Sequence, residues 1–138
     1  MNTAFHFAFK VKDIQSTIRF YHDILGCEKG RETENWVDFN FFGHQLSAHV
    51  SKNRPPLDFC GFVEELKVPI PHFGCVLEHK DFEIIKERLQ NNGLDFIIKP
   101  QDRYKGLGGE QQTMFVLDFS DNPLEFKSYK YSKGIFAN

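Results

Sequence analysis

Polar and apolar residues alternate at the start of the chain. Over residues 4–11, one side of an extended chain would carry only large apolar side chains, namely Phe5, Phe7, Phe9 and Val11. The opposite side carries His6, Ala8 and Lys10. A period of two predicts a strand with one buried face. We expect that face to pack under a helix, while His6 lies on the open face of a sheet.

A helical pattern follows this strand. Asp13 has a short, oxygen-bearing side chain that can cap the free N–H groups of a first helical turn. Large apolar residues then recur at helical spacing up to the C-capping Gly26, and they are Ile14, Ile18, Tyr21, Ile24 and Leu25. We therefore predict an amphipathic helix over residues 13–25.

Two further strands are predicted in the first half. The aromatic run 36–42 and the alternating run 45–50 flank Gly43 and His44, which indicate a turn. In the second run, the residues that share one face are Gln45, Ser47 and His49.

The second half repeats this order. His72 precedes a short apolar strand over residues 73–77, and Asp81 is placed to cap a helix that ends near Gly93. Strands are predicted at residues 94–98, 112–119 and 123–129, with a glycine-containing loop over residues 99–111. The repeat predicts an α+β fold of two βαβββ modules in one domain, residues 1–138. Its parts are module one at about 1–52, a proline-rich linker at about 53–70 and module two at about 71–131.

Length and charge exclude several classes of function. A chain of 138 residues fits one domain. Its 17 basic and 19 acidic residues are intermixed and give a formal net charge of −2, so we expect neither nucleic acid nor an anionic membrane as a partner. No apolar run approaches the roughly 20 residues of a membrane span, and no signal-peptide pattern is present. Three cysteines without CxxC spacing indicate reduced thiols, so we expect a cytoplasmic protein.

Three short motifs follow one another along the chain in a characteristic order. His6 stands seven residues before Asp13. The pairs Phe20-Tyr21 and Leu25-Gly26 lie on the first predicted helix, and Leu124-Glu125-Phe126 lies in the last predicted strand. Together they resemble the vicinal oxygen chelate superfamily, which includes glyoxalase I, extradiol dioxygenases, methylmalonyl-CoA epimerase, and fosfomycin and bleomycin resistance proteins. Residues 36–39, 42–46, 71–74 and 125–127 also resemble an uncharacterised bacterial group of predicted extradiol-type dioxygenases. The resemblance implies that the modules form an open, incompletely closed barrel.

The resemblance also implies a metal site. In that superfamily the ligands come from the first and last strands of each module, which corresponds here to His6, His72 and Glu125. Two imidazoles and one carboxylate leave room for a bidentate catecholate and dioxygen on Fe(II). The implied protein is a metal-dependent enzyme, foremost an extradiol-type dioxygenase that uses Fe(II) and a small catecholic or vicinal-oxygen substrate.

His49 separates this reaction from its alternatives. This residue could be a fourth ligand, an acid or base in the pocket, or a structural residue. With four ligands, a redox-silent Zn, Ni, Mn or Co ion would suit a glyoxalase-like or epimerase-like isomerase or lyase. A metal-free small-molecule-binding protein of the bleomycin-resistance type is the remaining alternative.

Two other segments carry expectations about the site and the assembly. Tyr104 lies in the predicted loop, where it could orient a substrate carboxylate or phenolate, or be solvated. The resemblance implies a homodimer, and the apolar run Gly134-Ile135-Phe136 would suit such a contact. Pro123 has no N–H to donate, so it predicts an unpaired position or a bulge beside Glu125.

Overall fold

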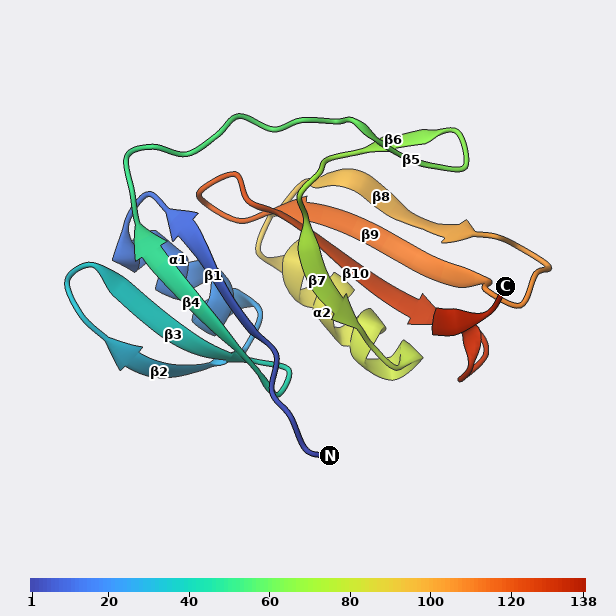
Figure 1. Cartoon of the computed structure of the whole chain (residues 1–138), viewed down its shortest axis with the longest axis horizontal. Coiled ribbons are helices and arrows are strands. Elements are labelled where there is room, and N and C mark those ends of the chain that lie inside the picture. The colour runs from blue at the N-terminus through green and yellow to red at the C-terminus, as the bar shows by residue number, and fades with distance from the viewer. The chain divides into compact units, whose positions relative to one another are not determined.

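The computed structural model describes all residues, 1–138, as two compact units. The first unit consists of Met1–Pro56 together with Asp118–Asn122, and the second of Leu57–Leu117 together with Pro123–Asn138. Each unit has its own four-stranded open sheet (Figure 1). No helix in either unit combines the length and the apolar character needed to cross a membrane.

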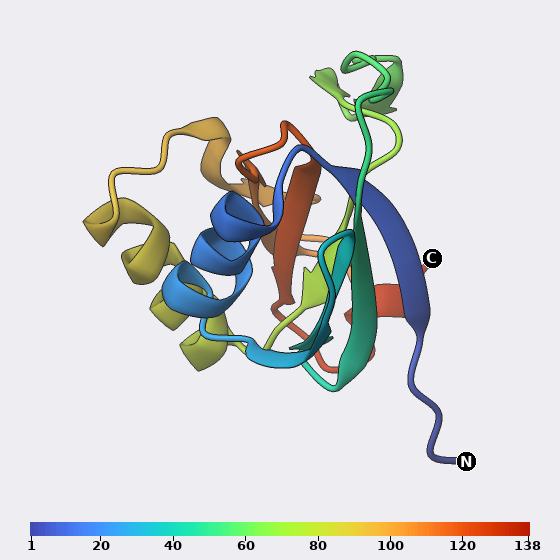
Figure 2. The same ribbon diagram turned by 90° about the vertical axis from the view of Figure 1, so that its left-hand side faces the viewer.

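The first unit follows the order strand, helix, three strands. Its elements are β1 (His6–Val11), α1 (Ile14–Ile18), η1 (Arg19–Ile24), β2 (Glu28–Glu32), β3 (Trp36–Phe41) and β4 (His44–Val50). The strand order in the sheet is β1-β4-β3-β2. β1 runs parallel to β4, and the other pairs are antiparallel. The helical segment α1–η1 covers one face of this sheet (Figure 2).

The second unit repeats this topology. Its elements are β5 (Gly61–Val63), β6 (Leu66–Val68), β7 (Phe73–Val76), α2 (His79–Asn91), β8 (Phe96–Arg103), β9 (Gln111–Leu117), β10 (Pro123–Tyr129) and η2 (Gly134–Phe136). The main sheet has the order β7-β10-β9-β8, again with its first strand parallel to its last. The predicted α+β fold of two βαβββ modules is therefore confirmed. The predicted linker contains a hairpin, β5–β6, that the sequence pattern did not indicate.

Large aromatic side chains fill the core of the first unit. Phe20, Tyr21 and Phe39 are almost completely buried. The Tyr21 hydroxyl donates a hydrogen bond of 2.8 Å to Oδ2 of Asp118, which belongs to the turn between β9 and β10. Burial raises the pKa of Tyr21 well above its ordinary value, and the Asp118 carboxylate adds to this shift. The turn is thus tied to the first unit by a buried polar contact.

The predicted first helix differs from the observed one. Asp13 caps it as expected, because its Oδ1 accepts from the Ser16 N–H at 2.7 Å. After Ile18, however, the helix widens into the π-helix η1, in which the Leu25 N–H donates to the Phe20 carbonyl. A π-turn shifts the face that the residues present, and here two consecutive residues, Phe20 and Tyr21, are both fully buried.

Other element boundaries also differ from the predictions. α2 begins at His79, because the Glu78 carbonyl already accepts from Asp81 and Phe82, so Asp81 lies within the first turn. β8 extends to Arg103 and shortens the predicted loop, and His44 belongs to β4. Of the two alternatives predicted from Pro123, the bulge is wrong, because β10 pairs with β9 without a register shift. Pro123 is the first residue of β10, a position where proline is tolerated.

Candidate functional site

His72 and Glu125 form a close pair in the second unit. His72 stands immediately before β7, and Glu125 is the third residue of β10. These strands are parallel neighbours, with Glu125 opposite Gly74. Nε2 of His72 lies 3.2 Å from Oε1 of Glu125, and the Glu125 side chain is only 9% exposed. Two of the three predicted metal ligands are therefore brought together.

Each member of this pair is held by a further hydrogen bond. Nδ1 of His72 lies 2.7 Å from the carbonyl oxygen of Pro69. A carbonyl can only accept, so Nδ1 carries a proton and Nε2 faces Glu125. On the other side, the Thr113 hydroxyl donates to Oε2 of Glu125. Histidine and carboxylate metal ligands are commonly fixed by such outer partners.

The electrostatics of the pair favour opposite charges. The hydrogen bond to Glu125 raises the pKa of His72, with burial acting in the opposite direction. Burial alone would raise the pKa of Glu125, but hydrogen bonds from His72 and Thr113 and the charge of Lys127 hold it below its ordinary value. Nζ of Lys127 is 3.6 Å from Oε1 of Glu125. The Glu125 carboxylate is therefore ionised, and its Oε1 atom is directed at the cationic groups of His72 and Lys127.

The spacing of the pair fits a shared divalent ion. Ligand atoms at about 2.1 Å from an ion lie about 3.0 to 3.4 Å apart in octahedral or tetrahedral arrangements, and the observed separation is 3.2 Å. Imidazole and carboxylate are also ligands that Zn, Mn and Fe accept. Neither unit on its own contains three such side chains close enough to complete a site.

His6 lies at the equivalent place in the first unit. It is the first residue of β1, which pairs with β4 as β7 pairs with β10. The His6 ring is exposed, and its Nδ1 lies 2.9 Å from Oε1 of Gln45. Like His72, it therefore uses Nδ1 for a protein oxygen.

His49 lies on the same sheet face as Gln45 but four residues further along β4. At about 3.3 Å per residue this is about 13 Å from the level of His6. The His49 ring is exposed and lies against Trp36, with ring centroids 6.3 Å apart. Within the first unit, His49 is thus not brought next to His6.

Tyr104 lines a pocket of about 300 Å³ in the second unit. Tyr129, which also lines the pocket, stands two residues after Lys127 and four after Glu125, so the three side chains share one face of the sheet. Gln111 lies opposite Tyr129 on the neighbouring strand and therefore shares this face. Its lining residues are Tyr104, Leu107, Gly109, Gln111, Tyr129, Gly134, Ile135, Ala137 and Asn138. This volume is at the lower end of the range of ligand pockets.

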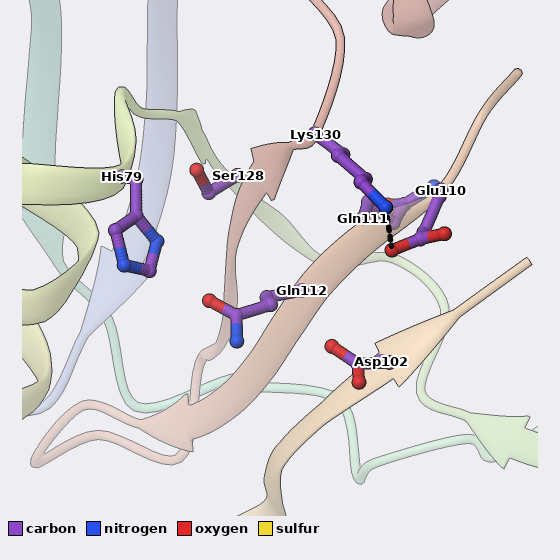
Figure 3. A pocket seen from close by; sticks show the side chains of 7 residues that line it. All are labelled: His79, Asp102, Glu110, Gln111, Gln112, Ser128 and Lys130. Atoms are coloured by element: carbon purple, nitrogen blue, oxygen red, sulfur yellow. Dashed lines mark ion pairs between the residues drawn. The ribbon is translucent and has the colours of Figure 1, made fainter. Parts of the chain in front are cut away.

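A second pocket, of about 310 Å³, lies on the opposite face of the same sheet (Figure 3). Gln112 and Ser128 pair across β9 and β10 and alternate with the residues of the Glu125 face. The lining is polar: His79, Asp102, Glu110, Gln111, Gln112, Ser128 and Lys130. Lys130 and Glu110 form an ion pair of 3.5 Å. Neither His72 nor Glu125 lines this pocket.

Sequence reasoning did not find the outer partners of the pair. Thr113 is 2% exposed and directly precedes the apolar run 114–117 of β9, which was a signal for a buried polar role. The Pro69 carbonyl left no such signal, because every residue has one and only the fold decides its direction.

Comparisons with known proteins agree with the fold of this chain. A model of the glyoxalase/bleomycin resistance protein/dioxygenase superfamily matches residues 3–126. The chain is 31% identical over 98 residues to the metallothiol transferase FosB of Staphylococcus haemolyticus, and the match covers 71% of this chain and 65% of that protein. The FosB of Staphylococcus epidermidis matches to the same extent. The match thus spans just under two thirds of the length of these relatives.

Solved structures show the same fold over almost the whole chain. A glyoxalase/bleomycin resistance protein/dioxygenase from Alicyclobacillus acidocaldarius superposes with a TM-score of 0.82 at 30% identity, covering 98% of this chain and 97% of that one. The fosfomycin resistance protein FosX from Listeria monocytogenes gives a TM-score of 0.71 at 14% identity, covering 97% and 98%, and this likeness concerns the fold alone.

Proposed function

Because the chain belongs to the glyoxalase/bleomycin resistance protein/dioxygenase superfamily, we propose that it is an enzyme that uses a divalent metal ion to activate a small molecule. The observation that carries this proposal is the oriented pair of His72 and Glu125, 3.2 Å apart. His6 is proposed as the third ligand, from the equivalent position in the repeat. When bound, the ion would act as a Lewis acid on the substrate oxygens.

The favoured reaction is a transfer that involves a thiol. Its support is the relationship to the two metallothiol transferases, each 31% identical over 98 residues. Mn, Zn, Ni or Co would serve such a reaction, because it needs no change in the oxidation state of the metal. Lys127 would help to hold a negatively charged, oxygen-rich substrate, since its ammonium group lies near Glu125.

Extradiol dioxygenation is the second candidate. It is favoured by the ligand set itself, because two histidines and one carboxylate match the facial triad of non-haem Fe(II) oxygenases. A catecholic substrate would need an aromatic-lined site, and Tyr104 and Tyr129 line a pocket on the face of Glu125. We propose Tyr104 as a substrate contact in either reaction. His49 keeps a proposed acid or base role only in an isomerase or lyase.

Metal binding tests the proposal directly. Metal-free protein is titrated with Mn²⁺, Zn²⁺ and anaerobic Fe²⁺ in calorimetry, for the wild type, His72→Ala, Glu125→Gln and His6→Ala. His79→Ala is the matched control, because His79 is an exposed histidine that lines the pocket on the other sheet face. About one ion per chain, lost in the three site variants and kept in His79→Ala, is the expected result. Unchanged binding in Glu125→Gln and His72→Ala would overturn it, and so would the absence of binding in the wild type.

Activity then separates the two reactions. Protein loaded with Mn²⁺ is incubated with fosfomycin and either glutathione or L-cysteine, and loss of the free thiol is measured. Protein loaded with Fe²⁺ is mixed with catechol, and oxygen uptake is measured. Thiol consumption that depends on Glu125 supports the transferase, whereas oxygen uptake that depends on Glu125 supports the dioxygenase instead.

A further inference from the structure

A chain of hydrogen bonds in the first unit leads from a buried carboxylate to His6. Asp38 of β3 is only 7% exposed. Its Oδ1 accepts from the Ser47 hydroxyl at 2.6 Å, and its Oδ2 accepts from Nε2 of Gln45 at 3.3 Å. Oε1 of Gln45 in turn lies 2.9 Å from Nδ1 of His6. Arg31, a largely exposed residue, adds a positive charge 3.8 Å from Oδ2 of Asp38.

The sheet register brings these side chains together. Asp38 is opposite Ser47 in the antiparallel pair β3–β4, and His6 is opposite Gln45 in the parallel pair β1–β4. Opposite residues project from the same face of a sheet. Three adjacent strands therefore each contribute at least one member to a single row of polar groups, although the members lie far apart in the sequence.

The carboxylate gives this row a direction. A carboxylate only accepts hydrogen bonds, so the Gln45 amide must turn its NH₂ group toward Asp38. Its carbonyl oxygen is then the atom that faces His6. Because that oxygen can only accept, the proton of the neutral His6 ring resides on Nδ1, and Nε2 keeps a free lone pair.

We propose that Asp38 and Gln45 are positioning residues that hold His6 as the Nδ1–H tautomer and so present Nε2 as a metal ligand. The role of His6 as a metal ligand rests on the proposed function, whereas its tautomer is a property of the metal-free protein. Nδ1 of His72 is likewise directed at a protein oxygen, the Pro69 carbonyl instead of an amide. Both proposed histidine ligands thus offer Nε2, through two unrelated devices.

The contact between Gln45 and Asp38 orients the amide as well as supplying a donor to the buried carboxylate. Ser47 already gives Asp38 a short hydrogen bond inside the sheet. The second carboxylate oxygen accepts a hydrogen bond from Gln45. Gln45 is exposed, so water could have satisfied its amide in place of Asp38. What the second contact achieves is the orientation of the amide, and through it of the imidazole.

Nuclear magnetic resonance tests the tautomer directly. Long-range ¹H–¹⁵N spectra of the histidine rings are recorded on EDTA-treated protein at alkaline pH, where imidazoles are neutral, and His6→Gln identifies the His6 signals. The wild type is expected to show His6 as the Nδ1–H form. Gln45→Leu removes the acceptor and should lose that form, whereas Gln45→Glu retains an acceptor and should keep it. Asp38→Asn lets the amide adopt both orientations, so a mixture is expected.

The controls separate orientation from folding. Ser47→Ala leaves the contact between Asp38 and Gln45 in place, so His6 should remain in the Nδ1–H form. Gln45 is exposed, so its variants should unfold at the temperature of the wild type. A wild-type His6 in the Nε2–H form would overturn the inference, and so would a tautomer ratio unchanged in both Gln45→Leu and Asp38→Asn.

Mn²⁺ titration of the same variants links the tautomer to the site. Gln45→Leu is expected to bind about 10- to 100-fold more weakly, the usual cost of losing an outer partner of a ligand, and Gln45→Glu should restore most of the affinity. If Glu125-dependent binding is present but Gln45→Leu matches the wild type, the positioning role fails and the proposed function stands. If the tautomers behave as expected but the wild type binds no metal, the proposed function fails.

Discussion

At the scale of single residues, Thr113 has the clearest task. Its buried hydroxyl donates to Oε2 of Glu125, so that the other oxygen, Oε1, faces Nε2 of His72. Thr113→Val keeps the shape of the side chain but removes this donor, so Glu125 can rotate. We expect Mn²⁺ affinity to fall about 10- to 100-fold, measured by calorimetry. Thr113→Ser retains the hydroxyl and should bind within a few-fold of the wild type. Equal affinity for Thr113→Val and the wild type would contradict this role.

The pair of His72 and Glu125 also predicts how stability depends on pH. The raised pKa of His72 stabilises the folded, metal-free protein at low pH, and this contribution is lost as pH rises through the raised value. The lowered pKa of Glu125 contributes above its ordinary range and is lost as pH falls through the lowered value. Both contributions are present together in the window between the ordinary pKa of glutamate and that of histidine.

Thermal unfolding of the chelator-treated protein tests this window. The difference in melting temperature between the wild type and Glu125→Gln should be greatest between about pH 4.5 and pH 6.5 and should shrink on both sides. The amide that this substitution introduces is isosteric with the carboxylate, so packing is retained while the charge is removed. A difference that is flat from acidic to alkaline pH would show that the pair is not electrostatic in the metal-free protein.

At the scale of elements, the close approach of β7 to β10 sets the position of Glu125. A Cβ atom at Gly74 would overlap the carbonyl oxygen of Glu125. Gly74→Ala therefore has to push β7 away from β10, and we expect a lower melting temperature together with weaker Mn²⁺ binding. Gly109→Ala is the control, because its nearest contact would be an ordinary 3.8 Å from the carbonyl oxygen of Gly134. Wild-type stability in Gly74→Ala would refute the tight strand contact.

The elements also show what local sequence patterns can and cannot predict. β1, β3, β4 and β10 were predictable because each buries one or both faces, which leaves a pattern of apolar residues. β7 is only half-buried on one face, but it still forms a short apolar run. β2 was missed, since all of its residues from Glu28 to Glu32 are exposed at the sheet edge and no alternation results. The π-helical turn at η1 was missed as well, because its apolar spacing resembles that of an α-helix.

The same distinction applies to the candidate site. His6, His72 and Glu125 could be proposed from equivalent positions in a repeat, which is a property of sequence order. The link from His6 through Gln45 to Asp38 depends on the register between three strands. Register is decided by long-range pairing, so no local pattern could reveal that Gln45 orients His6.

At the scale of the whole molecule, the exposed end of the chain bears on assembly. Phe136 is 92% exposed, beside Gly134, which packs tightly on Tyr129 and fixes the η2 turn. Leaving a phenylalanine in water forgoes about 1.5 to 3 kcal/mol of burial, so we propose that a second copy of the chain covers it in a homodimer.

Sedimentation velocity over a range of protein concentrations tests this proposal. Phe136→Ser is expected to weaken self-association about 10- to 100-fold, since each factor of ten corresponds to about 1.4 kcal/mol. Phe62→Ser is the matched control, because Phe62 is 66% exposed on the hairpin β5–β6 and should leave association unchanged. A monomeric wild type, or an equal effect of both substitutions, would remove Phe136 from any dimer contact. A specific effect of Phe136 alone would make η2 part of the interface and bring the partner close to the pocket that Ile135 lines.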